Sequence, residues 1–291
     1  MDYVVDINYL RTPADPTVLQ RPELGALLQS SAPSDRFILT DTAILETMKN
    51  EQWETTARAS FRIISQFPQK IWLAKAPGNL IRNELDTGRE TTEIIDAPAS
   101  ESFRLLMAEI MSGVDGPSMT FARANVAAAQ TDLAQAQQNH AANLQGLQLA
   151  VADIRSSIDI AGFRRISEPG QKDLVRLHRV KLLAQVALKK LIQLEGRPAN
   201  LGQSLAYGHG ILLRYQIGLY FLGFKRALTG TLSPDATRAT NELMDLDHAL
   251  VATYFDEILT EEASVREMSD DILQALNSNI QFAPAAAAPT T

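Results

Sequence analysis

The first hundred residues alternate short β-branched or aromatic runs with stretches of helical periodicity. Strands are predicted at residues 3–5, 36–39 and 70–74, with helical patterns between them. Thr40 or Asp41 follows the second strand directly and can cap the helix that comes next. Strands that are separated by helices pair in parallel. The sequence therefore predicts an α/β fold, with helices on both sides of a central parallel sheet in three layers.

The α/β pattern returns near the carboxyl end of the chain. Residues 205–228 are largely apolar and are interpreted as one buried helix, which Gly230 ends. Another helix reaches about residue 255, and a strand at 257–259 and a final helix at 263–276 follow. We therefore assign residues 1–97 and 205–281 to one α/β domain. The Pro/Ala-rich tail at 282–291 is predicted to be disordered.

The segment 98–204 between these parts has a different character. From residue 118 to about 161 it lacks proline, is rich in Ala and Gln, and repeats apolar residues with heptad-like spacing. A turn is predicted at 162–170, and an apolar helix at 174–194 is the expected partner. Residues 98–204 are thus predicted to form an α-helical hairpin inserted into the α/β domain. An oligomerisation arm is the equal alternative.

Composition excludes several classes of protein. The 291 residues include no cysteine, which excludes disulfide frameworks, cysteine-ligated metals and thiol nucleophiles. No basic stretch precedes an apolar run at the start, so no signal peptide is expected. The most apolar stretch, 211–228, contains Arg214, Lys225 and Arg226, which argues against a membrane span. We therefore expect a cytoplasmic protein without a membrane partner.

The net charge of −7 is unevenly distributed. Residues 155–197 contain ten basic and four acidic residues, so this segment carries a net charge of +6. Such a basic segment is a candidate for RNA binding, and a solvated helix face is the alternative interpretation. The candidate RNA-binding residues are Arg164, Arg165, Lys172, Arg176, Arg179 and Lys181.

Acidic residues gather near the predicted carboxyl ends of the strands, where parallel sheets bind ligands. Asp6 follows the first strand, Glu46 lies in the helix after the second, and Glu262 follows the last strand. Asp245 lies on the helix before the last strand, and Asp247 is its rival because residues two apart point in different directions. Carboxylates without His or Cys ligands suit Mg²⁺ or Mn²⁺. The four histidines show no paired ligand spacing and are interpreted as structural.

These residues resemble the motifs of the PIN-domain nucleases. Residues 4–8 (Val-Val-Asp-Ile-Asn) are similar to the opening strand and Asp-x-Asn of that family, and 37–46 to its second strand and acidic helix. Residues 245–252 and 256–262 resemble an Asp-x-x-His-x-x-x-Ala helix running into a strand that ends Thr-x-Asp. The large helical insertion is absent from the small toxin members of the family.

The resemblance assigns roles to individual residues. Asp6, Glu46 and Asp245 would be the metal-binding acids, with Asn8 and Thr260 as supporting polar residues. Glu262 stands where the family usually has Asp, which leaves a fourth ligand open.

The function that the resemblance implies is that of an endoribonuclease dependent on Mg²⁺ or Mn²⁺, with RNA as substrate and a role as a toxin or defence effector. The alternative is a catalytically inert PIN-like scaffold whose helical insertion binds a protein partner or forms a homo-oligomer. A phosphatase or DNA nuclease on the same carboxylates is a weaker third hypothesis, because metal and carboxylates alone do not select the phosphoester.

Overall fold

A four-stranded parallel sheet lies at the centre of the computed structural model, which describes residues 1–10, 22–48, 51–126, 140–230 and 236–278. The spatial order is β3-β2-β1-β4. The strands are β1 (Asp2–Val5), β2 (Arg36–Leu39), β3 (Ile71–Leu73) and β4 (Glu257–Leu259). Every strand pair is parallel. The predicted parallel sheet is confirmed, and β3 is shorter than the run at 70–74 suggested.

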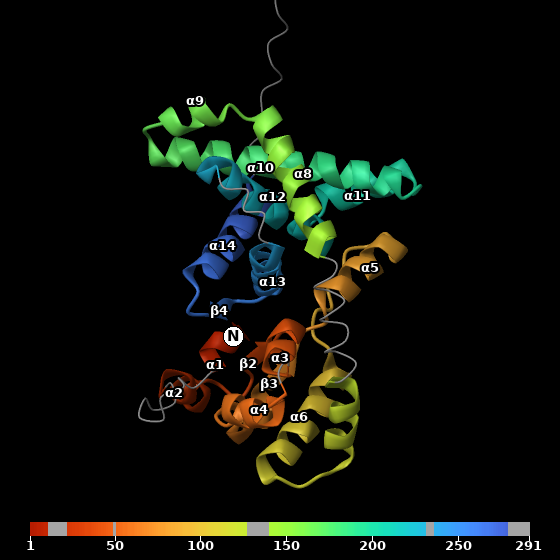
Figure 1. Ribbon diagram of the computed structural model, residues 1–291, viewed down its shortest axis with the longest axis vertical. Coiled ribbons are helices and arrows are strands. Elements are labelled where there is room, and N and C mark those ends of the chain that lie inside the picture. The colour runs from red at the N-terminus through yellow and green to blue at the C-terminus, as the bar shows by residue number, and fades with distance from the viewer. Residues whose placement is uncertain (11–21, 49–50, 127–139, 231–235, 279–291) are drawn as a thin grey trace, which may run out of the picture.

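Alternate residues of the strands point to opposite faces and supply two separate cores. Val4 and Ile38, which pair across β1 and β2, belong to one hydrophobic cluster. Their neighbours Tyr3, Val5 and Phe37 belong to the other. Because successive side chains of a strand alternate, a sheet that is apolar on both faces must be covered by helices on both. Figure 1 shows helices above and below the sheet.

The lower layer in Figure 1 is built mainly from the first part of the chain. Its core contains residues of a helix at 117–126 as well as of five earlier helices. Two short 3₁₀ turns, Ile64–Gln66 and Pro68–Lys70, lead into β3. The earlier helices are α1 (Ile7–Leu10), α2 (Pro22–Ser30), α4 (Trp53–Phe61) and α6 (Ala97–Ser112), and α3 (Asp41–Met48) contributes the buried Ala43.

The upper layer is arranged around α12 (Ile211–Thr229), which is buried along most of its length. Its neighbours approach closely at two glycines: a Cβ atom at Gly223 would lie 3.0 Å from that of Ala150, and one at Gly218 would collide with Leu246. The surrounding helices are α5 (Pro77–Thr87), α8 (His140–Ser157), α9 (Ile160–Arg165), α10 (Pro169–Leu194), α11 (Ala199–Tyr207), α13 (Ala236–Ala252) and α14 (Ala263–Asn277).

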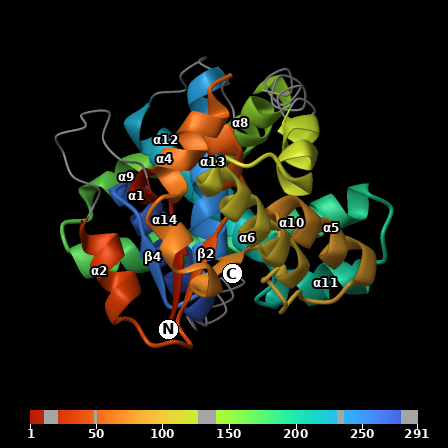
Figure 2. The same ribbon diagram turned by 90° about the horizontal axis from the view of Figure 1, so that it is seen from below.

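The segment 98–204 differs in detail from the predicted hairpin. Part of the continuous helix expected at 118–161 lies outside the described residues, and α8 ends at Ser157. The predicted turn at 162–170 is shorter in the structure: α9 extends to Arg165, so only residues 166–168 link it to α10. Asp159 caps α9 by accepting a hydrogen bond from the Gly162 amide at 2.9 Å. Helix α8 packs mainly on α12, and α10 packs on both α12 and α11, whereas α8 and α10 contact each other only slightly. Within this segment, α6 and the helix at 117–126 therefore belong to the lower layer, and α8, α9, α10 and α11 belong to the upper layer (Figure 1). Seen from below, the two layers overlap (Figure 2).

The prediction of a single helix at 205–228 is wrong, because residues 208–210 interrupt the helix and separate α11 from α12. The fully buried carboxylate of Glu84, on α5, accepts hydrogen bonds from the amides of Ile211 and Leu212 at 2.9 and 3.0 Å. It also accepts one from the Thr91 amide at 2.9 Å. Free amides at a helix start attract a carboxylate, so Glu84 stabilises a new helix start inside the apolar run.

Two further expectations concern the tail and the membrane. The tail predicted to be disordered, 282–291, lies outside the described residues. Within the described ranges, no helix is long and apolar enough to cross a membrane.

Replacing Glu84 with Gln should destabilise the fold by about 2–3 kcal/mol, because a buried charged acceptor of three amide hydrogen bonds becomes a neutral amide. Urea unfolding at pH 7 measures the change. Glu93→Gln is the matched control: that side chain is 83% exposed and pairs with Lys75 on the surface, so its loss should cost no more than about 0.5 kcal/mol. Equal losses in the two variants would contradict the role given to Glu84.

Candidate functional site

The candidate site lies where β1 and β4 end side by side. The chain runs from β1 to β2 to β3 in one direction across the sheet, whereas β4 joins on the other side of β1. Parallel sheets bind ligands at such a switch point, outside the carboxyl ends of the strands. Asp6 follows β1 and Thr260 follows β4, and their exposed fractions are only 3% and 4%. A buried carboxylate and a hydroxyl group therefore occupy the position where this fold class binds ligands.

Backbone and side-chain hydrogen bonds hold Asp6 against the end of β4. The Asp6 amide donates to the Leu259 carbonyl at 3.0 Å, which continues the sheet by one bond. The Thr260 hydroxyl donates to Asp6 Oδ2 at 2.7 Å and accepts a hydrogen bond from the Glu262 amide at 3.0 Å. The Thr260 hydroxyl oxygen accepts from the Glu262 amide, and the hydroxyl proton points to Asp6, whose carboxylate oxygen can only accept. Asp6, Thr260 and Glu262 are thus linked through one hydroxyl group.

Asp245, on α13, lies within electrostatic reach of the other predicted acids. Burial, the largest cause, and the charges of Glu262, Asp6 and Glu46 together raise the pKa of its carboxyl to about 7. Like charges disfavour each other's ionised form. The structure therefore brings the four acids proposed from the sequence into one electrostatic neighbourhood, although they come from four separate elements.

The chemistry of these donors suits a hard divalent cation, but they do not form a closed cage. In the part of the chain that the structure describes, no three His, Asp or Glu side chains are close enough to hold a metal ion as they stand. Mg²⁺ keeps several of its waters and commonly uses only one or two protein carboxylates. An open cluster of acids is compatible with that mode of binding.

Asp247 belongs to different surroundings from Asp245. Burial raises the pKa of Asp247 to about 7, and the nearby charge of Asp41 contributes to the shift. Burial raises the pKa of Tyr215, on α12, and the charge of Asp247 adds to that rise. The two aspartates of α13 thus face different groups, as their spacing suggested. Asn8 lies in α1, and its side chain is outside the described part of the structure.

His248 contacts the site, which the sequence reasoning missed. Its Nδ1 lies 2.9 Å from Oγ1 of Thr40, at the end of β2, and its Nε2 lies 3.9 Å from Oδ1 of Asp6. The side chains of His248 and Thr40 are both buried. A usable signal was present: His248 is three residues after Asp245, so the two share a helix face.

Arg266 is a second residue that the sequence reasoning did not select. It lies on α14, four residues after Glu262, and is exposed. Its Nη2 donates to the Thr260 carbonyl at 3.1 Å, which holds the guanidinium group at the edge of the acidic cluster. A cation in this position can bind a phosphate group.

Several of the predicted RNA-binding residues have partners within the fold. The Arg176 guanidinium forms an ion pair with Asp271 at 2.6 Å, and Arg164 donates to the Leu228 carbonyl. Lys181 donates to the carbonyls of Leu276 and Ser278 at 2.9 and 3.1 Å, at the end of α14. The remaining candidates, Arg165, Lys172 and Arg179, also lie on α9 and α10, at the top of Figure 1. Part of this basic segment therefore holds helices together.

Comparison with known proteins does not place the chain in a family: no family model, curated protein or solved structure matches it. Membership of the PIN-domain family therefore stays a prediction, and the site is interpreted from the chain's own geometry.

Replacing Asp245 with Asn should stabilise the protein more at pH 8 than at pH 5. The raised pKa means that the folded protein holds a proton that the unfolded chain releases above about pH 4, so stability falls as the pH rises from about 4 to about 7. Asn removes that loss, worth on the order of 1–2 kcal/mol once solvent screening of a partly exposed group is allowed for.

Urea unfolding of both proteins at pH 5 and pH 8 measures this difference. Asp270→Asn, an exposed carboxylate on α14, is the control and should shift stability equally at both pH values. If Asp245→Asn behaves like the control, Asp245 is not under the influence of the other acids.

Proposed function

We propose that this protein is an endoribonuclease that depends on Mg²⁺ or Mn²⁺. The observation that carries the proposal is the buried Asp6 at the switch point of the sheet, with Asp245 close enough to Asp6, Glu46 and Glu262 for their charges to raise its pKa. A protein gains nothing in stability from concentrating acids in this way. The arrangement becomes favourable when a cation neutralises them.

The residues divide between holding the cation and binding the substrate. Asp6, Asp245 and Glu46 would hold it, with Glu262 as a further ligand. When bound, a divalent cation polarises the phosphate and makes water a better nucleophile at neutral pH. Arg266, at the edge of the cluster, would bind the negative phosphate that enters the site. The hydrolysis adds water across a P–O bond of the RNA backbone.

RNA as substrate, and a role as a toxin or defence effector, follow from the resemblance to PIN-domain nucleases. Exposed basic residues of α9 and α10 would extend the contact with the RNA backbone. Arg165 supports this part of the proposal, because its side chain is 79% exposed and its contact with Asp159 is a distant 4.0 Å.

Cleavage of a fluorescent single-stranded RNA should require Mn²⁺ or Mg²⁺ and should stop in chelator. Asp6→Asn and Asp245→Asn should each lower the rate by about 100-fold or more, as expected when charge stabilisation of the reacting phosphate is lost. Asp270→Asn should cleave like the unchanged protein. Cleavage that persists in chelator, or in both site variants, would contradict the proposal.

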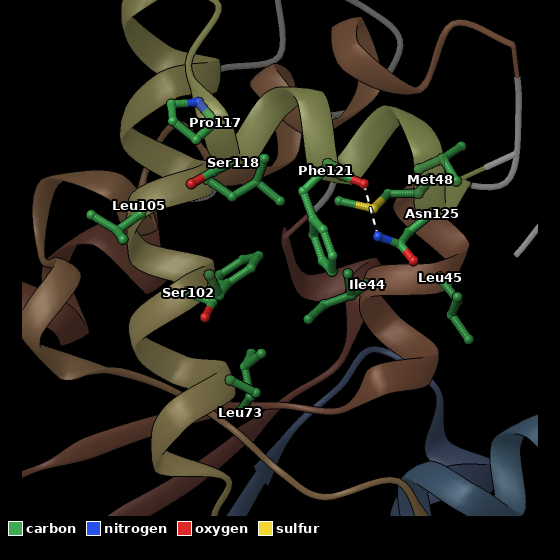
Figure 3. A pocket seen from close by; sticks show the side chains of 15 residues that line it. Ile44, Leu45, Met48, Leu73, Ser102, Leu105, Pro117, Ser118, Phe121 and Asn125 are labelled. Atoms are coloured by element: carbon green, nitrogen blue, oxygen red, sulfur yellow. Dashed lines mark hydrogen bonds between the residues drawn. The ribbon is translucent and has the colours of Figure 1, made fainter. Parts of the chain in front are cut away.

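An inert scaffold is the second candidate, and an apolar groove favours it. The groove has a volume of about 670 Å³ and lies between α3, α6 and the helix at 117–126 (Figure 3). Phe121 and Leu105, which line it, are 72% and 55% exposed. Apolar side chains concentrated in an exposed groove commonly mark a protein contact. In this alternative the groove receives a second copy of the chain.

Replacing Phe121 with Glu tests the alternative, because a charge in the groove would prevent apolar association. If the scaffold hypothesis holds, the unchanged protein is an oligomer by light scattering and Phe121→Glu is a monomer. Leu149→Glu is the control: Leu149 is 61% exposed on α8, away from the groove, and should leave the mass unchanged. A protein that is monomeric at all concentrations contradicts this alternative.

A further inference from the structure

His248 joins the ends of two strands and the acidic cluster. Thr40 follows β2, Asp6 follows β1, and His248 on α13 lies between them, with its Nδ1 directed to Thr40 and its Nε2 directed to Asp6. The exposed fractions of the three side chains are between 1% and 4%. Interactions between charged or polar groups are screened only weakly in such a buried place. The orientation of one imidazole ring is therefore coupled to the position of one carboxylate.

The Thr40 hydroxyl group can act as the hydrogen-bond donor to the imidazole ring of His248. The Thr40 hydroxyl oxygen already accepts a hydrogen bond from the Ala43 amide at 3.1 Å, which caps α3. Its own proton is then free to be donated to Nδ1 of His248 at 2.9 Å. In that arrangement Nδ1 is the acceptor and a ring proton lies on Nε2, which faces Asp6.

We propose that His248 is a positioning residue that holds the Asp6 carboxylate in the orientation needed for metal binding. Thr260 fixes Oδ2 of Asp6 by a 2.7 Å hydrogen bond, and the Nε2–H group of His248 attracts Oδ1 from the other side. At 3.9 Å the second contact is electrostatic and too long for a hydrogen bond, so it orients Oδ1 without occupying it fully. This inference rests on the proposed function, in which Asp6 binds a divalent cation.

Groups that support a metal ligand in this way have a measurable effect on affinity. Loss of such a partner typically weakens metal binding by about 10- to 100-fold.

Mn²⁺ affinity, measured by calorimetry without RNA, tests the proposal. His248→Ala should weaken binding by about 10- to 100-fold, and His248→Gln should recover part of the loss because its amide can still donate toward Asp6. His209→Gln is the control, since His209 is exposed before α12 and should bind Mn²⁺ like the unchanged protein. If the unchanged protein binds no Mn²⁺, the proposed function fails and this inference with it. If it binds Mn²⁺ and His248→Ala binds equally well, only the inference fails.

A measurement on the unchanged protein covers the case in which the buried variants do not fold. Long-range ¹H–¹⁵N spectra of the metal-free protein report which ring nitrogen carries the proton. We expect a proton on Nε2 of His248, and a change in that nitrogen's shift in Asp6→Asn but not in Asp270→Asn. A ring protonated only on Nδ1 would overturn the proposal, because a lone pair would then face the carboxylate.

Discussion

The carboxylate of Glu84 at the start of α12 is the interaction on which much of the structure depends. A helix that starts inside an apolar core has amides without internal partners, and leaving them buried and unbonded is costly. Glu84 satisfies two of these amides from α5, so α12 can begin at Ile211. Every major helix of the upper layer contacts α12. The position of α12 therefore sets the positions of the helices that reach the site.

The link from α12 to the site passes through α13. Gly218 lets α13 approach α12 at Leu246, and the side chains of Arg226 and Glu242 join the same two helices by a 2.7 Å ion pair. Leu246 lies between Asp245 and Asp247, so the packing that fixes α13 also fixes which aspartate faces the sheet. Repulsion between like charges opposes this packing, because the charge of Glu242 is among those that raise the pKa of Asp245. Function-related acids commonly reduce stability in this way.

Local sequence patterns predicted the sheet well because each strand is a short run rich in β-branched, aromatic or other apolar residues, and three of the four strands are followed directly by Asp or Thr. The strand at 36–39 matches β2, and 257–259 matches β4. The clustering of Asp6, Glu46, Asp245 and Glu262 could also be anticipated, because parallel strands end at one edge. The features that the sequence did not predict depend on residues that lie far away in the sequence. The break at residues 208–210 needs Glu84, which lies more than a hundred residues earlier, and the role of His248 depends on Thr40.

The uneven charge of the chain has a structural component as well as a functional one. The net charge of +6 at 155–197 suggested a surface for nucleic acid, yet Arg176 and Lys181 use their charge on α14, at Asp271 and at the last carbonyls of the helix. Cations favour the carboxyl end of a helix, so Lys181 stabilises α14 where its free carbonyls lie. The opposite end of α14 begins beside Glu262 and carries Arg266. Basic residues of the helical segment therefore help to hold α14, the helix that borders the acidic site. The basic segment and the acidic cluster thus both contact α14.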